Sequence, residues 1–93
     1  MSIAEHLVPY VQILRESFPA GVHGDRRGAL LAALYDEFSD RNLSEVLEGY
    51  FAENRHELLA EAIRARNTQH SAEEMAEIRR VLLEHGWSWD FDE

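Results

Sequence analysis

Apolar and polar residues alternate along this chain with the period of an α-helix, and one stretch departs from that alternation. Residues 29–35, Ala-Leu-Leu-Ala-Ala-Leu-Tyr, are apolar throughout, and the stretch runs on to Phe38. It is too short to span a bilayer, and a helix without a polar face must be enclosed by its neighbours. The pattern therefore predicts a buried helix at the centre of a small bundle.

Four further segments carry apolar residues at helical spacing, which is typical of amphipathic helices. Their apolar stripes are, in chain order, Ile3, Leu7, Tyr10, Val11, Leu14 and Phe18; Leu43, Val46, Leu47, Tyr50 and Phe51; Leu58, Leu59, Ala62 and Ile63; and Met75, Ile78, Leu82 and His85. No two-residue strand period precedes the tail. The sequence thus predicts an all-α fold, a compact bundle of five short helices with the second helix buried.

Proline and glycine mark the limits of the first two helices. Pro9 lies within the first apolar stripe, so it either kinks that helix or marks its true first turn, and a kinked or late-starting helix is favoured. The helix is expected to end before Pro19, because a residue that precedes proline avoids helical geometry. Residues 19–24 form the clearest loop, and Asp25 is expected to cap the second helix through its side chain.

Capping signatures predict the remaining helix ends. A cap residue followed three positions later by glutamate forms a capping box. Such pairs are Ser2 with Glu5, Asn54 with Glu57, and Ser71 with Glu74. Ser39 is predicted to cap the third helix. Gly86 should end the fifth helix in the left-handed conformation, with Trp87 folded back onto Leu82 or Leu83.

Composition limits the classes of protein to which the chain can belong. Its 93 residues suffice for one domain, assigned to residues 1–87, followed by an acidic, aromatic tail at residues 88–93. A hydrophobic content of 45% excludes wholesale disorder, and the lack of cysteine excludes disulfides and thiolate metal sites. A net charge of −9 disfavours binding to nucleic acid and to anionic membranes. Residues 2–18 resemble neither a signal peptide nor a membrane anchor, so a cytoplasmic location is expected.

Motifs that could carry catalysis or bind a metal are incomplete. His56 opens a stretch like the zinc-protease motif, but Ala60 occupies the position of its second histidine. Glu53 and His56 resemble half of a di-iron motif without the other half. The arginines are assigned to ion pairs within their own helices rather than to basic patches. We therefore predict no catalytic residue, no cofactor and no metal site.

Three residues remain as candidates for contact with a partner. His23 lies between glycines in a loop, where polar residues often form sites. Trp89 and Phe91 alternate with polar residues beyond the last helix, where they either pack over the bundle or are offered to a partner. We expect a possible protein partner, and a chain that is a monomer or a weak homodimer.

Several of these motifs also resemble a known family. Residues 18–22 (Phe-Pro-Ala-Gly-Val), the apolar second helix, residues 38–40 (Phe-Ser-Asp) and the stretch from Ser71 to Gly86-Trp87 are similar to the pattern of DUF3349, an actinobacterial domain-of-unknown-function family. The resemblance covers residues 18–87 and implies a compact bundle of five helices without a known activity. The chain departs from the pattern at residues 23–26 and 88–93. The resemblance supplies no catalytic residue.

Plentiful stabilising motifs and missing catalytic ones favour a non-enzymatic protein–protein interaction or regulatory module. The alternative is a helix-turn-helix-like regulator that binds nucleic acid. The short connection between the second and third helices allows that geometry, but the acidic balance and the apolar second helix disfavour it. An enzyme with a site centred on His23 ranks below both.

Overall fold

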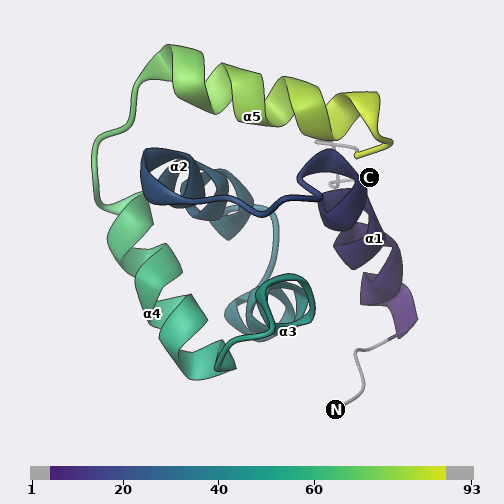
Figure 1. Cartoon of the computed structure of the whole chain (residues 1–93). Coiled ribbons are helices and arrows are strands. Elements are labelled where there is room, and N and C mark those ends of the chain that lie inside the picture. The colour runs from purple at the N-terminus through teal and green to yellow at the C-terminus, as the bar shows by residue number, and fades with distance from the viewer. Residues whose placement is uncertain (1–4, 88–93) are drawn as a thin grey trace.

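The computed structural model describes residues 5–87, which form helices joined by short turns (Figure 1). In chain order these are the 3-10 helix η1 (Glu5–Leu7), α1 (Val8–Ser17), α2 (Gly24–Tyr35), α3 (Asp40–Phe51), α4 (Arg55–Arg66) and α5 (Ala72–Glu84). The described residues contain no strand. The predicted all-α bundle is therefore confirmed.

Helix α2 lies at the centre of the bundle, with the other four α-helices arranged around it (Figure 1). It packs against α3, α4 and α5. Its middle is fully enclosed, because Ala29, Leu30 and Leu31 each expose 0% of their surface. The prediction of a buried second helix is confirmed for this middle part, whereas Asp25 and Arg26 in the first turn are exposed.

Three of the predicted N-caps are formed by backbone amides that donate to side-chain oxygens. Ser39 Oγ accepts from the amide three residues further on at 3.3 Å, and Ser71 Oγ does the same at 3.0 Å. Asn54 Oδ1 accepts from the amides of residues 56 and 57 at 2.9 and 3.1 Å. These bonds satisfy amides that have no partner within the helix, and each fixes the start of α3, α4 or α5 as predicted.

The predicted cap at Asp25 is wrong. Helix α2 begins at Gly24, two residues earlier than a cap at Asp25 implies, and His23 occupies the N-cap position without a side-chain hydrogen bond to the helix. Gly24 has a φ of +62°, which glycine adopts readily, and so it can turn the chain into the helix. Asp25 therefore lies inside the first turn, where its charge is favoured by the positive end of the helix dipole.

Pro9 lies in the first turn of α1. Of the two predicted roles, it marks the true start of the helix, where its missing N–H costs no hydrogen bond. The first helix thus starts late, after η1. The capping box predicted from Ser2 to Glu5 involves a residue outside the described range.

Gly86 ends α5 as predicted, with a φ of +103°. Its amide donates to the Leu83 carbonyl oxygen at 3.1 Å, and the Trp87 amide donates to the Leu82 carbonyl oxygen at 2.9 Å. These are the two hydrogen bonds of a Schellman turn. The turn carries Trp87 back over the bundle instead of away from it.

Trp87 completes a group of three rings, which we term the closed cluster: Tyr10, Phe38 and Trp87. The Trp87 ring centroid lies 5.0 Å from that of Tyr10 and 6.0 Å from that of Phe38, both edge to face. Tyr10 and Phe38 meet in the same way at 5.2 Å. Trp87 is only 2% exposed, so the cluster seals the bundle where α1 starts and α2 ends.

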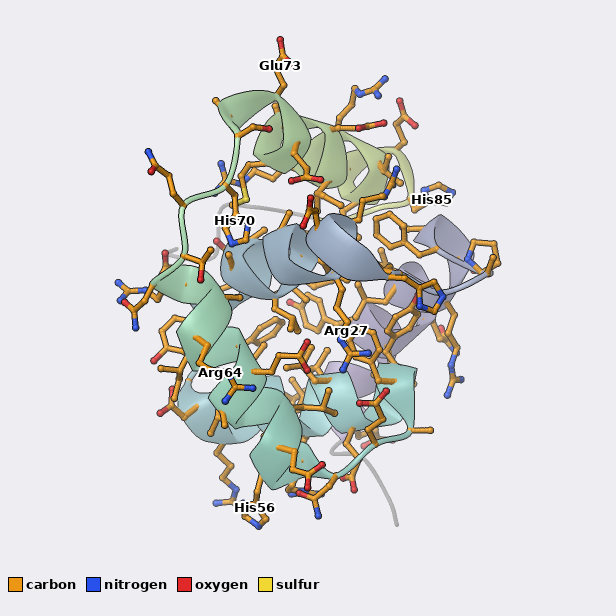
Figure 2. All side chains as sticks on the ribbon, turned by 60° about the vertical axis from the view of Figure 1, so that its left-hand side comes forward. Arg27, His56, Arg64, His70, Glu73 and His85 are labelled. Atoms are coloured by element: carbon orange, nitrogen blue, oxygen red, sulfur yellow. The ribbon has the colours of Figure 1, made fainter. Side chains whose placement is uncertain are left out.

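Among the described residues of the predicted apolar stripes, two are exposed. Ile63 on α4 is 39% exposed, because it lies off the face formed by the buried residues Ala62 and Ala65. His85 lies at the edge of the bundle (Figure 2), exposed, with Nδ1 2.9 Å from the Val81 carbonyl oxygen. It follows Leu82, the last buried residue of α5.

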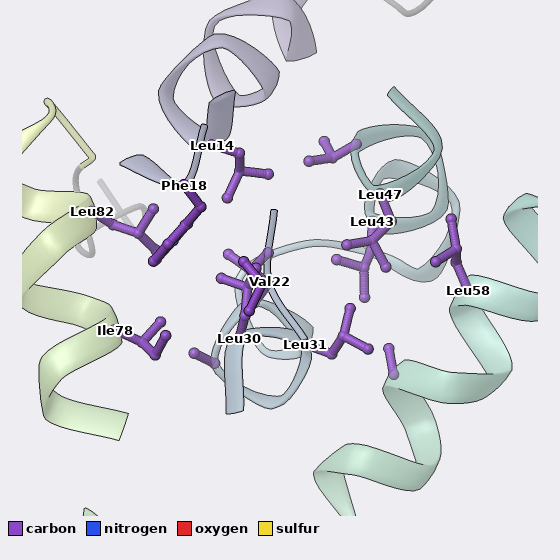
Figure 3. Close-up of a cluster of buried hydrophobic side chains, with 14 of the residues drawn as sticks. Leu14, Phe18, Val22, Leu30, Leu31, Leu43, Leu47, Leu58, Ile78 and Leu82 are labelled. Atoms are coloured by element: carbon purple, nitrogen blue, oxygen red, sulfur yellow. The ribbon is translucent and has the colours of Figure 1, made fainter. Parts of the chain in front are cut away.

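The helices share one continuous core, shown in part in Figure 3. Leu14 from α1, Leu47 from α3, Leu58 from α4 and Leu82 from α5 are each at most 1% exposed. Full burial of such side chains contributes about 1.5–3 kcal/mol each. The core therefore fixes where the ends of α1, α2 and α3 lie relative to one another.

Candidate functional site

A groove of about 270 Å³ opens at the end of the bundle where α1 stops, α2 starts and α3 stops. Its apolar lining consists of Phe18, Pro19, Val22, Tyr50 and Phe51. Phe18 and Val22 are buried and form the floor, whereas Pro19 is exposed. The groove lies at the opposite end of α1 and α2 from the closed cluster.

Arg27 builds one wall of the groove by binding two carboxylates. Its Nε and Nη2 donate to the two oxygens of Glu61 at 2.8 Å each, and Nη1 and Nη2 donate to Glu53 at 3.2 and 2.8 Å. The guanidinium also lies 4.4 Å from the centroid of the Phe51 ring. Arg27 thus links α2 to α4 and to the turn between α3 and α4; it reaches across the space below α2 in Figure 2.

These contacts keep both partners charged. The hydrogen bonds that Arg27 donates to Glu53 and Glu61 raise the pKa of Arg27 above its ordinary value. The hydrogen bond from Arg27 lowers the pKa of Glu53 below its ordinary value. Neither group can exchange a proton near neutral pH, so the pair is a fixed wall of the groove rather than an acid–base couple.

Two further hydrogen bonds hold the end of α1 against α3. Tyr50 Oη donates to the Phe18 carbonyl oxygen at 2.6 Å, and Arg15 Nη2 donates to the Gly49 carbonyl oxygen at 3.1 Å. Burial raises the pKa of Tyr50, which keeps its hydroxyl protonated as a donor. These two side chain-to-backbone hydrogen bonds therefore fix the end of α1 beside the end of α3, where the aromatic lining of the groove lies.

His23 is exposed and lines the groove, as expected of a loop residue that could meet a partner. Its ring folds over Gly21, because a Cβ atom at that glycine would lie 3.3 Å from Nε2. Arg15 also lines the groove, and the Arg26 guanidinium lies 5.8 Å from the Phe18 ring centroid. A chain of net charge −9 thus places Arg15 and His23 in the lining of an apolar groove, with Arg26 beside one ring of its floor.

The arginines pair mainly between helices, which corrects the prediction of pairs within helices. Besides the pairs of Arg27, the interhelical contacts include Arg55 with Glu48 at 2.6 Å and with Glu45 at 3.9 Å, and Arg66 with Asp36, the C-cap of α2, at 3.2 Å. Arg80 with Glu84, at 4.0 Å, is a pair within one helix. Spacing along a helix could not reveal the other pairs, because their partners are separated by 7 to 34 residues in the chain.

A second, larger hollow of about 580 Å³ lies between the start of α2 and the start of α5. Its acidic lining residues are Asp25, Glu73, Glu74 and Glu77. His70 lies beside them with Nε2 2.8 Å from the Ala65 carbonyl oxygen. Glu73 points away from the bundle in Figure 2. This hollow has no aromatic residue in its lining, so the groove is the stronger candidate site.

Of the three predicted contact residues, the structure places only His23, because Trp89 and Phe91 lie outside the described residues. The rest of the groove was not predicted. One signal was present in the sequence: Tyr50 and Phe51 are adjacent on a helix, where neighbouring side chains point about 100° apart. Both rings pack against the core and both are partly exposed, so the pair widens the apolar stripe at the end of α3 and lines the groove.

The incomplete metal motifs remain incomplete in space. Glu53 lies in the turn that separates α3 from α4, and His56 points outward from α4 (Figure 2). Within residues 5–87, no group of three or more histidine, cysteine, aspartate or glutamate side chains is placed to hold a metal ion. Over the same residues, every helix is too short or too polar to cross a membrane.

Comparison with known proteins finds no match to the chain among protein-family models, curated proteins or solved structures. The resemblance to DUF3349 thus stays a prediction.

Proposed function

We propose that this chain is a non-enzymatic protein–protein interaction module and that the groove is its binding surface. One observation carries the proposal: on a chain of net charge −9, an apolar, aromatic floor is bordered by Arg15 and His23, and the Arg26 guanidinium lies 5.8 Å from the centroid of the Phe18 ring in that floor. An apolar floor with a charged border is the usual composition of an interface core and its rim. The preferred partner is a protein segment that carries an aromatic or aliphatic side chain beside acidic residues.

The size of the groove supports a peptide segment rather than a cofactor. Sites for small molecules and cofactors usually enclose about 300–1,000 Å³. At about 270 Å³ the groove is below that range, and it has room for one or two side chains of a partner. Most of the binding energy of a protein interface comes from a few such anchors.

The walls are prepared for binding in the free protein. Arg27 is held by two carboxylates and Tyr50 by the Phe18 carbonyl oxygen, so these side chains lose little freedom when a ligand enters. The lining residues include no serine, threonine, cysteine or second histidine that could work with His23 as a nucleophile or base. We therefore favour binding over catalysis at this surface.

Affinity capture from a native extract tests the proposal. The wild-type chain is compared with Arg15→Glu/Arg26→Glu, which reverses two charges at the groove. The matched control is Arg64→Glu/Arg80→Glu, which reverses two exposed arginines on α4 and α5 that do not line it. We expect a specific protein to be retained by the wild type and the control and lost with the groove variant. Equal retention by all three would contradict the proposal.

The alternative, a helix-turn-helix-like regulator, gains no support from α3, which would follow the turn in such a motif. This helix carries Asp40, Glu45 and Glu48 against a single arginine, Arg41. Acidic side chains on a recognition helix would repel the phosphates of DNA. Elution of the wild-type chain from heparin at low salt, with no retention at physiological ionic strength, is the expected result; salt-resistant retention would favour the alternative. Membership of DUF3349 and a cytoplasmic location accompany the proposal as further hypotheses.

A further inference from the structure

We infer, on the basis of the proposed function, that the groove takes a protein segment in which one acidic and one basic residue lie on opposite sides of a single large apolar side chain. The apolar side chain enters the groove, the acidic residue faces Arg15, and the basic residue faces Glu53. The basic residue is new to the partner chemistry proposed above, and the charges in the groove lining require it.

Among the described residues, four that can carry a charge line the groove: Arg15, His23, Arg27 and Glu53. Two of them are arginines, so the lining would be basic if each arginine counted as a full positive charge. The two arginines differ, however, because Arg27 binds carboxylates and Arg15 binds a backbone carbonyl.

Arg27 brings no net positive charge to the groove. It is shared between Glu53 and Glu61, at 2.8 Å each. Carboxylates are ordinarily ionised at neutral pH, and one guanidinium cannot neutralise two of them, so the three side chains together carry a charge of about −1. The hydrogen bond from Arg27 also lowers the pKa of Glu53, which keeps that carboxylate ionised.

The excess negative charge is presented to the groove by Glu53. Its side chain is 48% exposed, against 34% for that of Glu61, and of the two only Glu53 belongs to the groove lining. Both of its oxygens accept from Arg27, at 2.8 and 3.2 Å. Because a carboxylate offers about four lone-pair sites, each oxygen can accept a further hydrogen bond. A basic side chain of a partner can therefore bind Glu53 without displacing Arg27.

Arg15, in contrast, keeps its positive charge. Its Nη2 donates to the Gly49 carbonyl oxygen at 3.1 Å, and this acceptor is uncharged. The side chain is exposed, and a guanidinium has about five N–H donors in all, so it can also bind a carboxylate of a partner.

The two charges lie on either side of the aromatic residues of α3. Arg15 is bound to Gly49, which precedes Tyr50 and Phe51, whereas Glu53 follows them. Both rings line the groove. An apolar side chain that packs on them thus has a cation on one side and a carboxylate on the other. Charges of this kind at the border of an interface align the partners and disfavour segments of the wrong charge.

This arrangement disfavours two simpler partners. A segment with acidic residues on both sides of its anchor would place one of them against Glu53. A segment with basic residues on both sides would place one of them against Arg15. Only a segment with opposite charges on its two sides satisfies both ends of the groove.

Selection from a phage-displayed library of random dodecapeptides tests the inference. The full-length wild type is compared with Arg15→Gln and Glu53→Gln, each of which removes one charge from the groove. The matched controls are Arg64→Gln and Glu57→Gln, which remove the same charges from exposed positions on α4 outside the lining. Circular dichroism and melting establish that each protein is folded. All selections are made at about pH 8, where imidazoles are ordinarily neutral.

Peptides selected on the wild type and on both controls should share one aromatic or large aliphatic position, with an acidic residue on one side and a basic residue on the other. On Arg15→Gln only the preference for the acidic residue should disappear, and on Glu53→Gln only the preference for the basic one. Acidic residues on both sides, a motif without charged positions, or no selected peptide at all would each overturn the inference.

Calorimetric titration with a synthetic copy of the selected peptide shows which charges meet. Replacing its acidic residue by the amide should weaken binding to the wild type by about twofold to fivefold, the range of an exposed ion pair. The same replacement should have no effect on Arg15→Gln and its full effect on Glu53→Gln. Replacing the basic residue by glutamine should give the opposite result. Equal effects on the two variants would overturn the assignment.

These outcomes also separate the inference from the proposed function. If the selected peptides lack paired charges but a captured protein is lost with Arg15→Glu/Arg26→Glu, the partner chemistry is wrong and the interaction module stands. If no peptide is selected and capture is indifferent to that variant, the proposed function fails as well.

Discussion

The two ends of the bundle each gather three aromatic residues, yet one end is closed and the other is open. At the closed cluster, Tyr10, Phe38 and Trp87 pack edge to face, and each ring contacts the other two. At the groove, the Tyr50 and Phe51 rings meet edge to face at 4.7 Å and Phe18 is buried, but a groove of about 270 Å³ stays open beside these three rings.

The difference lies in the backbone at each end. A Schellman turn at Gly86 delivers Trp87 onto the closed cluster, where it excludes solvent. At the groove the chain passes from α1 to α2 through a short loop. Among the described residues, two guanidinium groups, and no tryptophan ring, lie near the aromatic residues there: that of Arg26 near Phe18 and that of Arg27 near Phe51. Aromatic residues thus stabilise the fold at one end of the bundle and line a surface groove at the other.

The largest expected effect comes from the core beneath both ends. Leu34 is 0% exposed, so Leu34→Asp would bury a carboxylate without a partner. The cost is several kcal/mol against a total stability of about 5–15 kcal/mol. We expect loss of cooperative unfolding by circular dichroism. A folded Leu34→Asp protein that melts like the wild type would contradict the enclosed position of α2.

Removing one aromatic ring from each end measures how much each end contributes to the free energy of unfolding. Trp87→Ala should lower the free energy of unfolding by about 3–5 kcal/mol, the usual cost of emptying a buried aromatic site. Phe51→Ala should cost only about 1–2 kcal/mol, because its ring is partly exposed. Urea denaturation gives both values. Equal costs would mean that the groove is as much a part of the core as the closed cluster.

The Schellman turn can be tested without changing an aromatic residue. Gly86→Val forces a β-branched residue into the left-handed region and should cost about 1 kcal/mol or more. Gly86→Ala, which has no branch at Cβ, is the control and should cost less. Thermal melting should rank wild type, Gly86→Ala and Gly86→Val in descending order. A Gly86→Val protein as stable as the wild type would show that the turn does not hold Trp87 in place.

The smallest expected effect concerns pH, and it has opposite signs at the two ends. The pKa of Glu53 at the groove is lowered by Arg27, so its stabilising contribution is present above the ordinary value of 4.5 and lost as the pH falls through the lower, folded pKa. Burial raises the pKa of Glu37, beside Phe38, so its charged form opposes folding above that folded pKa. At pH 7, Glu53→Gln should lower the melting temperature and Glu37→Gln should raise it, each by no more than about 2 °C. Shifts of the same sign would contradict this assignment.

Local features of the fold could be predicted from the sequence, and features shared between distant segments could not. The caps at Ser39, Asn54 and Ser71 and the turn at Gly86 each depend on a few adjacent residues, and the structure confirms them. The predicted cap at Asp25 lies two residues after the observed N-cap, His23, because a glycine with positive φ starts the helix without a side-chain cap.

The groove shows most clearly which features could not be predicted from the sequence. Its lining comes from the end of α1, the following loop, α2 and the end of α3, and Arg27 finds its carboxylates 26 and 34 residues away. No spacing rule within one helix connects these residues. His23 could be singled out because glycines mark a loop, whereas the aromatic walls resembled ordinary members of an apolar stripe.

The most direct measurement of the central claim, that the groove is the open, binding end of this bundle, is the change in backbone amide chemical shifts of the full chain when the protein captured from the native extract is added. The account predicts changes at residues 15–27 and 49–53, with the amides of Tyr10 and Phe38 unchanged. Changes centred on Tyr10 and Phe38, with residues 15–27 silent, would contradict it.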